Sequence, residues 1–231
     1  MFSDAFFYVR YRFGRKLFGH ATVGNGGERP NARKLMAVRP DHYARYLFAL
    51  RFLKKSGLAK KSTSILDFAC GVGYGTKVLA TGLPKAEVWG YDISDYAIDF
   101  AKEYWSGPKN ANFSVGDAEH LNTQLVEVCD AIVSFETIEH VSDPNAVLEN
   151  FFKYLDRDGI LILSFPNEEA LPFSKEKFPY HMQHFTAASM KSTLEKIGFA
   201  QIDVYSQKGR YNYRVNKGDQ GEFLVITCRK M

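Results

Sequence analysis

The segment Ile65–Gly75 combines residue types that suit ligand binding, because a buried strand turns sharply there into a helix. A short apolar run ends in Asp67, and small residues follow at Ala69, Gly71 and Gly73. Glycine tolerates positive φ angles and lets a ligand approach the backbone closely, so the turn can receive a phosphate or another polar group. A strand-to-helix turn that only packs is the alternative interpretation.

Three further predicted strands end in polar residues. Asp92 ends the second strand, 19 residues after Gly73, where an acidic side chain can accept hydrogen bonds from ribose hydroxyls. Asp117 follows the third strand, and Ser134-Phe135 ends the fourth. Ligands of open α/β sheets lie outside the carboxyl ends of the strands, so we expect these residues to meet the turn at one crevice.

Glu136, Glu139 and His140 are spaced i, i+3 and i+4. On a helix their side chains share one face and can gather two carboxylates and an imidazole around one cation. A later histidine, His181 or His184, offers a further ligand from a loop. Alternatively, His140 or His181 acts as a general base, because imidazole titrates near neutral pH. His140 can also serve as a plain hydrogen-bonding group inside the fold.

Strand-like and helical runs alternate from residue 62 onward, which predicts a doubly wound, mainly parallel α/β sheet. Seven strands are expected, at 64–69, 87–91, 112–115, 131–134, 160–165, 200–206 and 223–228. Helices are expected at 76–81, 96–105, 144–155 and 187–197. Only a polar connector, residues 207–221, separates the last two strands, so they should form a terminal antiparallel pair.

Residues 1–61 are predicted to form a basic helical cap on a domain of residues 62–231. They hold 14 Lys and Arg against 3 Asp and Glu, whereas the remainder holds 16 against 23. Helices are expected at 2–18 and from 41 to about 56. Such a cap can attract phosphate, nucleic acid or an anionic membrane surface, and a solvated helix without a specific partner is the alternative.

Composition favours a soluble globular protein, with 45% hydrophobic and 24% charged residues. No apolar run approaches the roughly 18 residues of a membrane span. The N-terminus lacks the apolar core of a secretory signal. The three cysteines lie far apart in apolar segments, which indicates reduced thiols in a cytoplasmic protein rather than disulfides or a zinc cluster.

The small residues after Asp67 recur at every second position, unlike the Gly-x-Gly-x-x-Gly turn of nicotinamide enzymes. This pattern resembles the class I S-adenosylmethionine (SAM)-dependent methyltransferases over about residues 62–230. The resemblance implies SAM as the cofactor, with its methionine moiety at the turn and its ribose at Asp92. Glycine is usual at position 69, and Ala69 is expected to fit if its φ is negative. The implied cofactor-binding residues are Asp67, Ala69, Gly71, Gly73, Asp92, Ile93, Asp117, Ala118, Ser134 and Phe135.

Two further resemblances concern the acceptor. The Glu136–His140 segment resembles metal-dependent O-methyltransferases of small RNAs and of the ubiquinone pathway, as well as metal-free small-molecule enzymes. The first likeness implies a divalent cation such as Mg²⁺ on Glu136, Glu139, His140 and His181. Residues 180–186, with 27–29 and 43–46, resemble methyltransferases of sugar and polysaccharide pathways. There Tyr43 or Arg45 is implied to reach the SAM carboxylate, unless Tyr43 packs in the core and Arg45 is solvated.

The expected function is therefore SAM-dependent O-methylation, with a saccharide or glycolipid-type hydroxyl as the first choice of acceptor. Three alternatives remain: methylation of a phenolic or quinone precursor, metal-dependent RNA 2′-O-methylation, and a non-catalytic methyltransferase-like binding protein. The basic N-terminus adds an expected peripheral membrane contact.

Overall fold

The computed structural model describes residues 22–23, 29–30, 33–58, 63–120, 128–209 and 212–231. The helix expected at 2–18 lies outside these residues, and so does the membrane contact expected of it. The described chain begins with a short antiparallel pair, β1 (Thr22–Val23) and β2 (Arg29–Pro30), followed by the 3₁₀ turn η1 (Leu35–Ala37).

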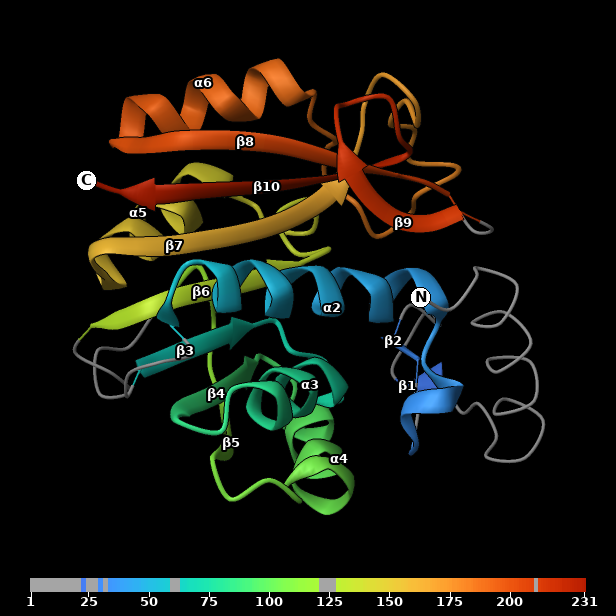
Figure 1. The fold of residues 1–231 in the computed structure, drawn as a ribbon. Coiled ribbons are helices and arrows are strands. Elements are labelled where there is room, and N and C mark those ends of the chain that lie inside the picture. Colours follow the sequence, from blue (N-terminus) through green and yellow to red (C-terminus); the bar gives the residue numbers. More distant parts are fainter. Residues whose placement is uncertain (1–21, 24–28, 31–32, 59–62, 121–127, 210–211) are drawn as a thin grey trace.

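The central sheet has the strand order β5-β4-β3-β6-β7-β10-β8-β9 (Figure 1). Its strands are β3 (Thr63–Phe68), β4 (Ala86–Asp92), β5 (Ala111–Val115), β6 (Cys129–Phe135), β7 (Leu155–Pro166), β8 (Phe199–Lys208), β9 (Asn212–Lys217) and β10 (Phe223–Lys230). The five neighbouring strands β5-β4-β3-β6-β7 run parallel to one another. Strand β10 pairs antiparallel with both β7 and β8. The predicted mainly parallel α/β sheet with antiparallel terminal strands is confirmed.

The sheet contains eight strands, so the prediction of seven was wrong. The additional strand, β9, lies in the segment interpreted as a polar connector and pairs antiparallel with β8. Within it Tyr213 is 2% exposed and Val215 packs against the core. Such a strand is difficult to predict from its composition, because only every second side chain faces the protein and the residues between them are polar.

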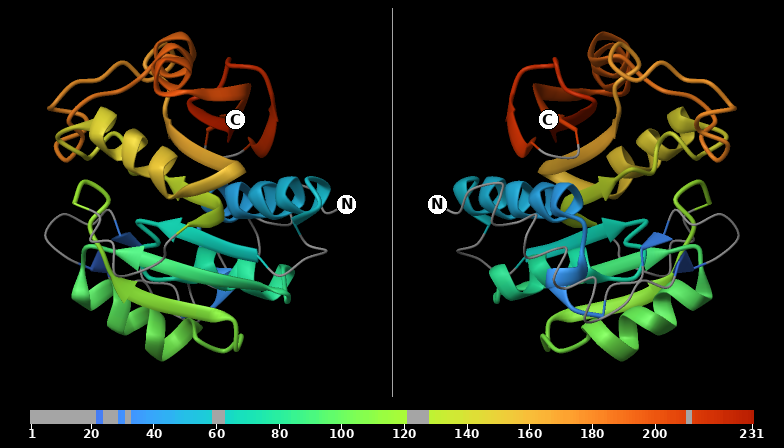
Figure 2. Two further views of the ribbon diagram at one scale, coloured as in Figure 1. Left: turned by 90° about the vertical axis from the view of Figure 1, so that its left-hand side faces the viewer. Right: turned by 90° about the vertical axis from the view of Figure 1, so that its right-hand side faces the viewer.

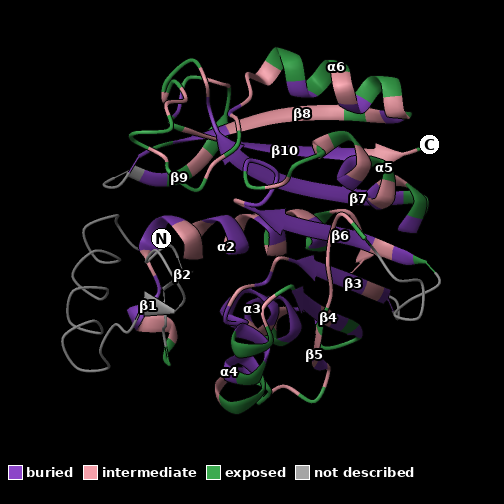
Figure 3. Cartoon of the chain, turned by 180° about the vertical axis from the view of Figure 1, so that it is seen from behind, coloured by how far each residue is buried: buried purple, intermediate pink, exposed green. Residues whose placement is uncertain are grey.

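Five helices cover the two faces of the sheet (Figure 2). These helices are α2 (Pro40–Lys55), α3 (Tyr74–Gly82), α4 (Asp95–Trp105), α5 (Pro144–Tyr154) and α6 (Ala187–Ile197). One hydrophobic cluster joins α2, α3 and α4 to one face, and a second joins α5 and α6 to the other. Adjacent strand residues such as Ile65 and Leu66 enter different clusters, as alternation requires. Figure 3 shows the resulting buried centre.

The strand order fixes where a ligand crevice must form. After β5 the chain crosses to the other side of β3 and continues with β6, so β3 and β6 are neighbours at a point where the order reverses. Crevices at the carboxyl ends of such strands are the usual ligand sites of open α/β sheets.

Helix α2, which belongs to the predicted cap, packs into the hydrophobic core of the domain. Its Tyr46, Ala49 and Leu53 are buried in the same cluster as α3 and α4. A Cβ atom at Gly75 would overlap the Tyr46 ring, so this glycine permits the two helices to approach. None of the helices in the described ranges is long and apolar enough to span a membrane.

Candidate active site

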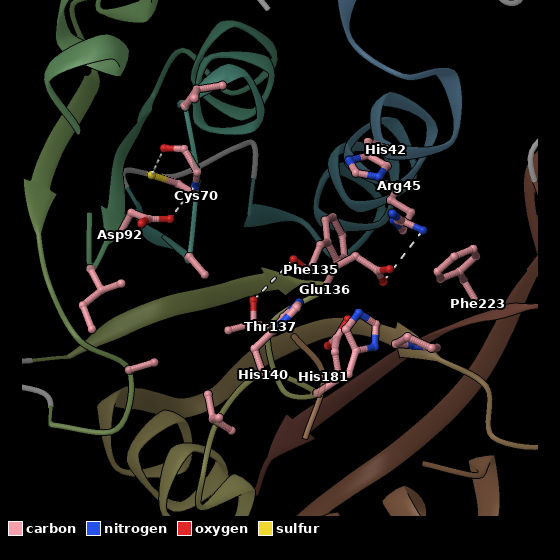
Figure 4. A pocket seen from close by; sticks show the side chains of 18 of the residues that line it. His42, Arg45, Cys70, Asp92, Phe135, Glu136, Thr137, His140, His181 and Phe223 are labelled. Atoms are coloured by element: carbon pink, nitrogen blue, oxygen red, sulfur yellow. Dashed lines mark hydrogen bonds and ion pairs between the residues drawn. The ribbon is translucent and has the colours of Figure 1, made fainter. Parts of the chain in front are cut away.

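A cavity of about 670 Å³ opens at the carboxyl ends of β3, β4 and β6 (Figure 4). Helix α2 and the long loop after β7 supply its other walls. Asp92 and Cys70 lie toward one end, whereas His140, His181 and Phe223 lie toward the other (Figure 4). The two ends of the cavity therefore differ in chemistry.

The turn after β3 is strongly left-handed. The φ angles of Ala69, Gly71 and Gly73 are +56°, +55° and +88°. The condition of a negative φ, under which Ala69 was expected to fit, is therefore not met, and a non-glycine residue there carries a cost of roughly 1–2 kcal/mol. A Cβ at Gly71 would meet nothing within 4 Å, whereas one at Gly73 would overlap Ala101 and Phe113. Gly71 thus leaves open space beside the cavity, and Gly73 permits close packing.

Asp67 lies beneath the turn and is not among the residues that line the cavity. It is fully buried, and its carboxylate accepts hydrogen bonds from the Tyr46 hydroxyl at 3.0 Å and from Thr76 Oγ1 at 2.7 Å. Burial raises its pKa to about 7, although both hydrogen bonds act in the opposite direction. The observed contacts of Asp67 tie α2 and α3 to the turn, and its role in cofactor binding stays a prediction.

Asp92 lines the cavity at the end of β4 and is 3% exposed. Its Oδ2 accepts a hydrogen bond from the backbone N–H of Gly71 at 2.9 Å, and its Oδ1 accepts one from Ser94 at 3.0 Å. Ser94 also caps α4, since its hydroxyl accepts from the Ala97 N–H at 3.3 Å. Asp92 is therefore held rigidly against the turn. Ile93, which also lines the cavity, is 62% exposed.

Residues 116–119, after β5, form a further part of the cavity wall. Asp117 Oδ1 accepts from the Glu119 N–H at 2.9 Å, which shapes the turn. Glu119 in turn accepts from the backbone N–H groups of Ser142 and Asp143 at 3.0 and 2.9 Å. Asp117 and Ala118 line the cavity. The turn is thus clamped to the start of α5.

The structure separates Ser134 from Phe135. Ser134 is buried and donates to Thr137 Oγ1 at 3.0 Å, and it does not line the cavity. Phe135 does line it, and its ring packs edge-on against Tyr46 with centroids 4.9 Å apart. Phe135 therefore belongs to the cavity wall and Ser134 to its support.

Residues 136–140 form a turn, so the shared face that their spacing would give on a helix does not form. Glu136 has a φ of +53°, which an α-helix does not accept. Its Oε1 accepts from Ser164 Oγ at 2.8 Å and lies 3.8 Å from Arg45 Nη1. Arg45 is 1% exposed and donates to Gln207 Oε1 at 2.9 Å, so the alternative of a solvated Arg45 is also wrong. Glu136 thus turns toward α2 (Figure 4).

Glu139, His140 and His181 come together from two distant segments. One ligand atom from each lies within 4.8 Å of the others. The two imidazole rings are nearly perpendicular, with centroids 4.7 Å apart. Glu139 is fully buried. Of the four predicted metal ligands the structure therefore groups three, and it directs Glu136 to Arg45 and Ser164.

Two nitrogens and one oxygen are a donor set for ions such as Zn²⁺ or Fe²⁺. Mg²⁺ prefers oxygen ligands in octahedral geometry, so the three grouped residues fit it poorly.

Hydrogen bonds at Nδ1 orient both histidines, to a carbonyl oxygen for His140 and to a second imidazole for His181. His140 Nδ1 lies 3.1 Å from the Tyr180 carbonyl, and His181 Nδ1 lies 2.7 Å from His184 Nε2. His184 was the alternative metal ligand to His181. Its side chain is fully buried, and it does not line the cavity. Burial lowers the pKa of His181 to about 4, assisted by the nearby charges of His140, His184 and Lys175.

Several lining residues were not predicted from sequence as cavity residues, among them Arg39, His42, Tyr74 and Phe223. Arg39 and His42 lie at the N-terminal end of α2, Tyr74 begins α3, and Phe223 begins β10. The sequence signal available for the first two was Pro40, which is typical of the first position of a helix.

Comparisons with known proteins agree with this geometry. Residues 59–224 match the model of a methyltransferase domain family. The malonyl-[acyl-carrier protein] O-methyltransferase of Bacillus anthracis is 33% identical over 138 residues, which are 58% of this chain and 50% of that protein. A phosphoethanolamine N-methyltransferase of Triticum aestivum is 32% identical over 51% of this chain and 25% of its own length. The chain spans about half the length, or less, of the first curated relatives it matches.

Solved structures share the fold. The N-methyltransferase NodS from Bradyrhizobium japonicum WM9, in complex with S-adenosylhomocysteine, has a TM-score of 0.66 at 17% identity and is matched over 98% of its length and 96% of this chain. The magnesium protoporphyrin IX methyltransferase of Synechocystis PCC 6803, also with S-adenosylhomocysteine bound, has a TM-score of 0.63 at 18% identity, over 96% of its length and 99% of this chain. The chain belongs to this methyltransferase domain family, and it has the fold of solved methyltransferases that hold S-adenosylhomocysteine.

Proposed function

We propose that this chain transfers the methyl group of SAM to a hydroxyl oxygen of a small acceptor, most specifically a saccharide or glycolipid-type intermediate. The observation that carries the proposal is the pairing of His140 and His181 at the end of the cavity that lies away from Asp92. One end thus offers groups for the cofactor, and the other offers proton acceptors beside the transferred methyl group.

The cofactor end supplies three kinds of contact. The open space at Gly71 admits the methionine moiety close to the backbone. Asp92 is buried and fixed by two backbone N–H groups, and its carboxylate can accept further hydrogen bonds from ribose hydroxyls. The exposed side chain of Ile93 offers an apolar surface to the adenine ring, with Asp117 and Ala118 at its edge.

Methyl transfer to a hydroxyl breaks the sulfur–methyl bond, forms a carbon–oxygen bond and releases the hydroxyl proton. Positioning the two molecules in line supplies much of the rate enhancement. His140 Nδ1 faces a carbonyl oxygen, which only accepts, so Nδ1 carries the ring proton and Nε2 the lone pair. His140 or His181 can therefore take the proton, and the low pKa of His181 keeps its ring neutral at pH 7.

The presence of histidines that can accept a proton favours a hydroxyl over a carboxylate as the methyl acceptor. Among the relatives, the names of the malonyl-[acyl-carrier protein] and juvenile hormone acid O-methyltransferases point to acid acceptors. A carboxylate is already ionised at pH 7 and requires no base. Carboxyl methylation is the second candidate function, supported by those names.

The walls of the acceptor end suit a polyhydroxyl compound. Polar side chains of Arg39, Glu136 and Thr137 line it and can hydrogen-bond several hydroxyls, while the rings of Phe178 and Phe223 offer flat apolar surfaces. Mixed walls of this type are usual in small-molecule sites.

A bound divalent ion is a further way in which Glu139, His140 and His181 could act, since their ligand atoms lie within 4.8 Å of one another. Such an ion would supply a Lewis acid beside the acceptor oxygen.

The proposal is tested by incubating the protein with methyl-labelled SAM and separate panels of nucleotide sugars and glycosides, phenolic acids, dicarboxylic acids and short RNAs. Label in the saccharide panel supports the proposal. Label confined to another panel replaces the acceptor class, and no binding of SAM by calorimetry contradicts the enzymatic proposal as a whole.

A further inference from the structure

We propose that His184 is a positioning residue, which fixes the ring of His181 so that its Nε2 carries the lone pair beside the acceptor. The use of that lone pair rests on the proposed function, but the ring orientation itself does not. His184 is not among the residues that line the cavity, and its side chain is fully buried. It would act only through His181.

The proton positions follow from one carbonyl group. His184 Nδ1 lies 2.6 Å from the Leu171 carbonyl oxygen. Because a carbonyl cannot donate, Nδ1 of His184 must carry a proton, and in the neutral ring Nε2 is then an acceptor. His184 Nε2 lies 2.7 Å from His181 Nδ1, so His181 donates from Nδ1. Its Nε2 is left as the nitrogen with the lone pair.

The surroundings prevent the two rings from turning. The Phe178 ring stacks on His181 with centroids 5.1 Å apart and meets His184 edge-on at 4.7 Å. Phe173 packs against His184 at 5.5 Å. A flip of either imidazole would place a ring carbon against a hydrogen-bonding partner, which forfeits a buried hydrogen bond.

The loop that carries these histidines is itself fastened. The Glu168 N–H donates to the Phe185 carbonyl at 3.0 Å, which closes the base of the loop after β7. The Met182 N–H donates to the Glu139 carbonyl at 2.7 Å, next to His181. His181 is therefore held from both sides, by its backbone neighbour and by His184.

His140 shows why the additional residue is needed. Its Nδ1 reaches the Tyr180 carbonyl directly, at 3.1 Å. His181 reaches the carbonyl of Leu171 only through His184. The Nδ1 atoms of both rings are thus linked to a carbonyl oxygen, directly for His140 and through His184 for His181. In the neutral rings Nε2 then carries the lone pair. A histidine that only filled space in the loop would not require this chain of hydrogen bonds.

The test is ring ¹⁵N NMR of the full chain labelled at histidine, at pH 7 without any ligand. The His181 signals are identified by their loss in His181→Gln. In the wild type we expect a protonated Nδ1 and an unprotonated Nε2 for His181. A wild-type ring protonated at Nε2 overturns the proposal, whatever the variants do.

Two variants then separate positioning from packing. His184→Leu fills the site with an apolar side chain but removes the acceptor nitrogen Nε2. This variant should abolish the preference for the Nδ1-protonated form of His181. His184→Gln can still accept from His181 and donate to Leu171, and should retain it. His120→Gln, at an exposed site beside Asp117, is the control and should leave the His181 signals unchanged. An unchanged His181 tautomer in folded His184→Leu contradicts the proposal.

The same samples keep the two proposals apart. Calorimetric titration with SAM tests the cofactor, and it does not depend on the tautomer of His181. A protein that binds no SAM but shows the expected ring signals refutes the proposed function and leaves the role of His184 intact. A protein that binds SAM but has His181 protonated at Nε2 refutes the role of His184 and leaves the proposed function intact.

Discussion

The Tyr46 hydroxyl donates a hydrogen bond to Oδ1 of the fully buried Asp67 at 3.0 Å, and so joins helix α2 to the base of the turn after β3. This contact crosses the boundary expected between a cap and a separate domain. It connects folding of α2 with the shape of the cavity, because Asp67 also accepts from Thr76 in α3.

Removal of that hydroxyl should destabilise the protein. In Tyr46→Phe one oxygen of the buried Asp67 loses its donor, and the free energy of unfolding should fall by about 1–3 kcal/mol. Urea unfolding measures the change. Tyr96→Phe, at a 55% exposed position in α4, is the matched control. Equal stability of the two variants would show that the Tyr46–Asp67 contact contributes nothing.

Asp67 should make stability depend on pH. Its pKa is 3.8 in an unfolded chain and about 7 when folded, so the folded state binds the proton more tightly. Its contribution to stability is complete below pH 3.8 and is lost as pH rises through about 7. Asp67→Asn cannot titrate. Relative to this variant, the wild type should lose about 2–3 kcal/mol of unfolding free energy between pH 5 and pH 8.

Urea unfolding at both pH values gives that difference, with Asp99→Asn on the exposed side of α4 as the control for a general charge effect. Parallel pH profiles for wild type and Asp67→Asn would mean that Asp67 does not change its proton affinity on folding.

Asp92 should be required for SAM affinity. Loss of charge-assisted hydrogen bonds to the ribose in Asp92→Ala should weaken binding about 10- to 100-fold. Isothermal titration calorimetry measures the affinity, and Asp99→Ala is the control. Since Asp92 also accepts from Gly71, thermal unfolding must show that the variant is folded. Wild-type affinity in folded Asp92→Ala would remove Asp92 from the site.

Chelation should distinguish a base from an ion at the acceptor end. If His140 or His181 accepts the proton directly, methyl transfer is unchanged after dialysis against EDTA. Loss of activity that Mn²⁺ or Zn²⁺ restores would instead assign an ion to Glu139, His140 and His181. In that case Glu139→Gln should lower metal affinity and Glu136→Gln should not, because the Glu136 carboxylate contacts Ser164 and Arg45.

Sequence patterns predicted the parts of the fold that follow from local periodicity. The apolar runs of β3, β6 and β7 are buried on both faces, so their strands were readily predicted. The β9 strand was not, because its inward residues, Tyr213 and Val215, alternate with polar ones. The i, i+3, i+4 spacing of Glu136, Glu139 and His140 would place them on one face of a helix, whereas residues 136–140 form a turn in which Glu136 has a positive φ.

Contacts between distant residues were beyond the reach of the sequence. Nothing in the spacing of Tyr46 and Asp67 indicates that they share a hydrogen bond across 21 positions. The two histidines of residues 181–184 look equivalent in sequence, but packing by Phe173 and Phe178 buries one and leaves the other on the cavity wall. Such roles depend on tertiary packing rather than on residue type.

The most direct test of hydroxyl methylation is the stability of the transferred label toward mild alkali. Methyl ethers resist it, whereas methyl esters of carboxylic acids hydrolyse. With labelled SAM and the saccharide panel, the account predicts alkali-stable label that is lost when His140→Gln and His181→Gln are combined and is retained in His120→Gln. Alkali-labile label, or alkali-stable label made equally well by the combined variant, would contradict it.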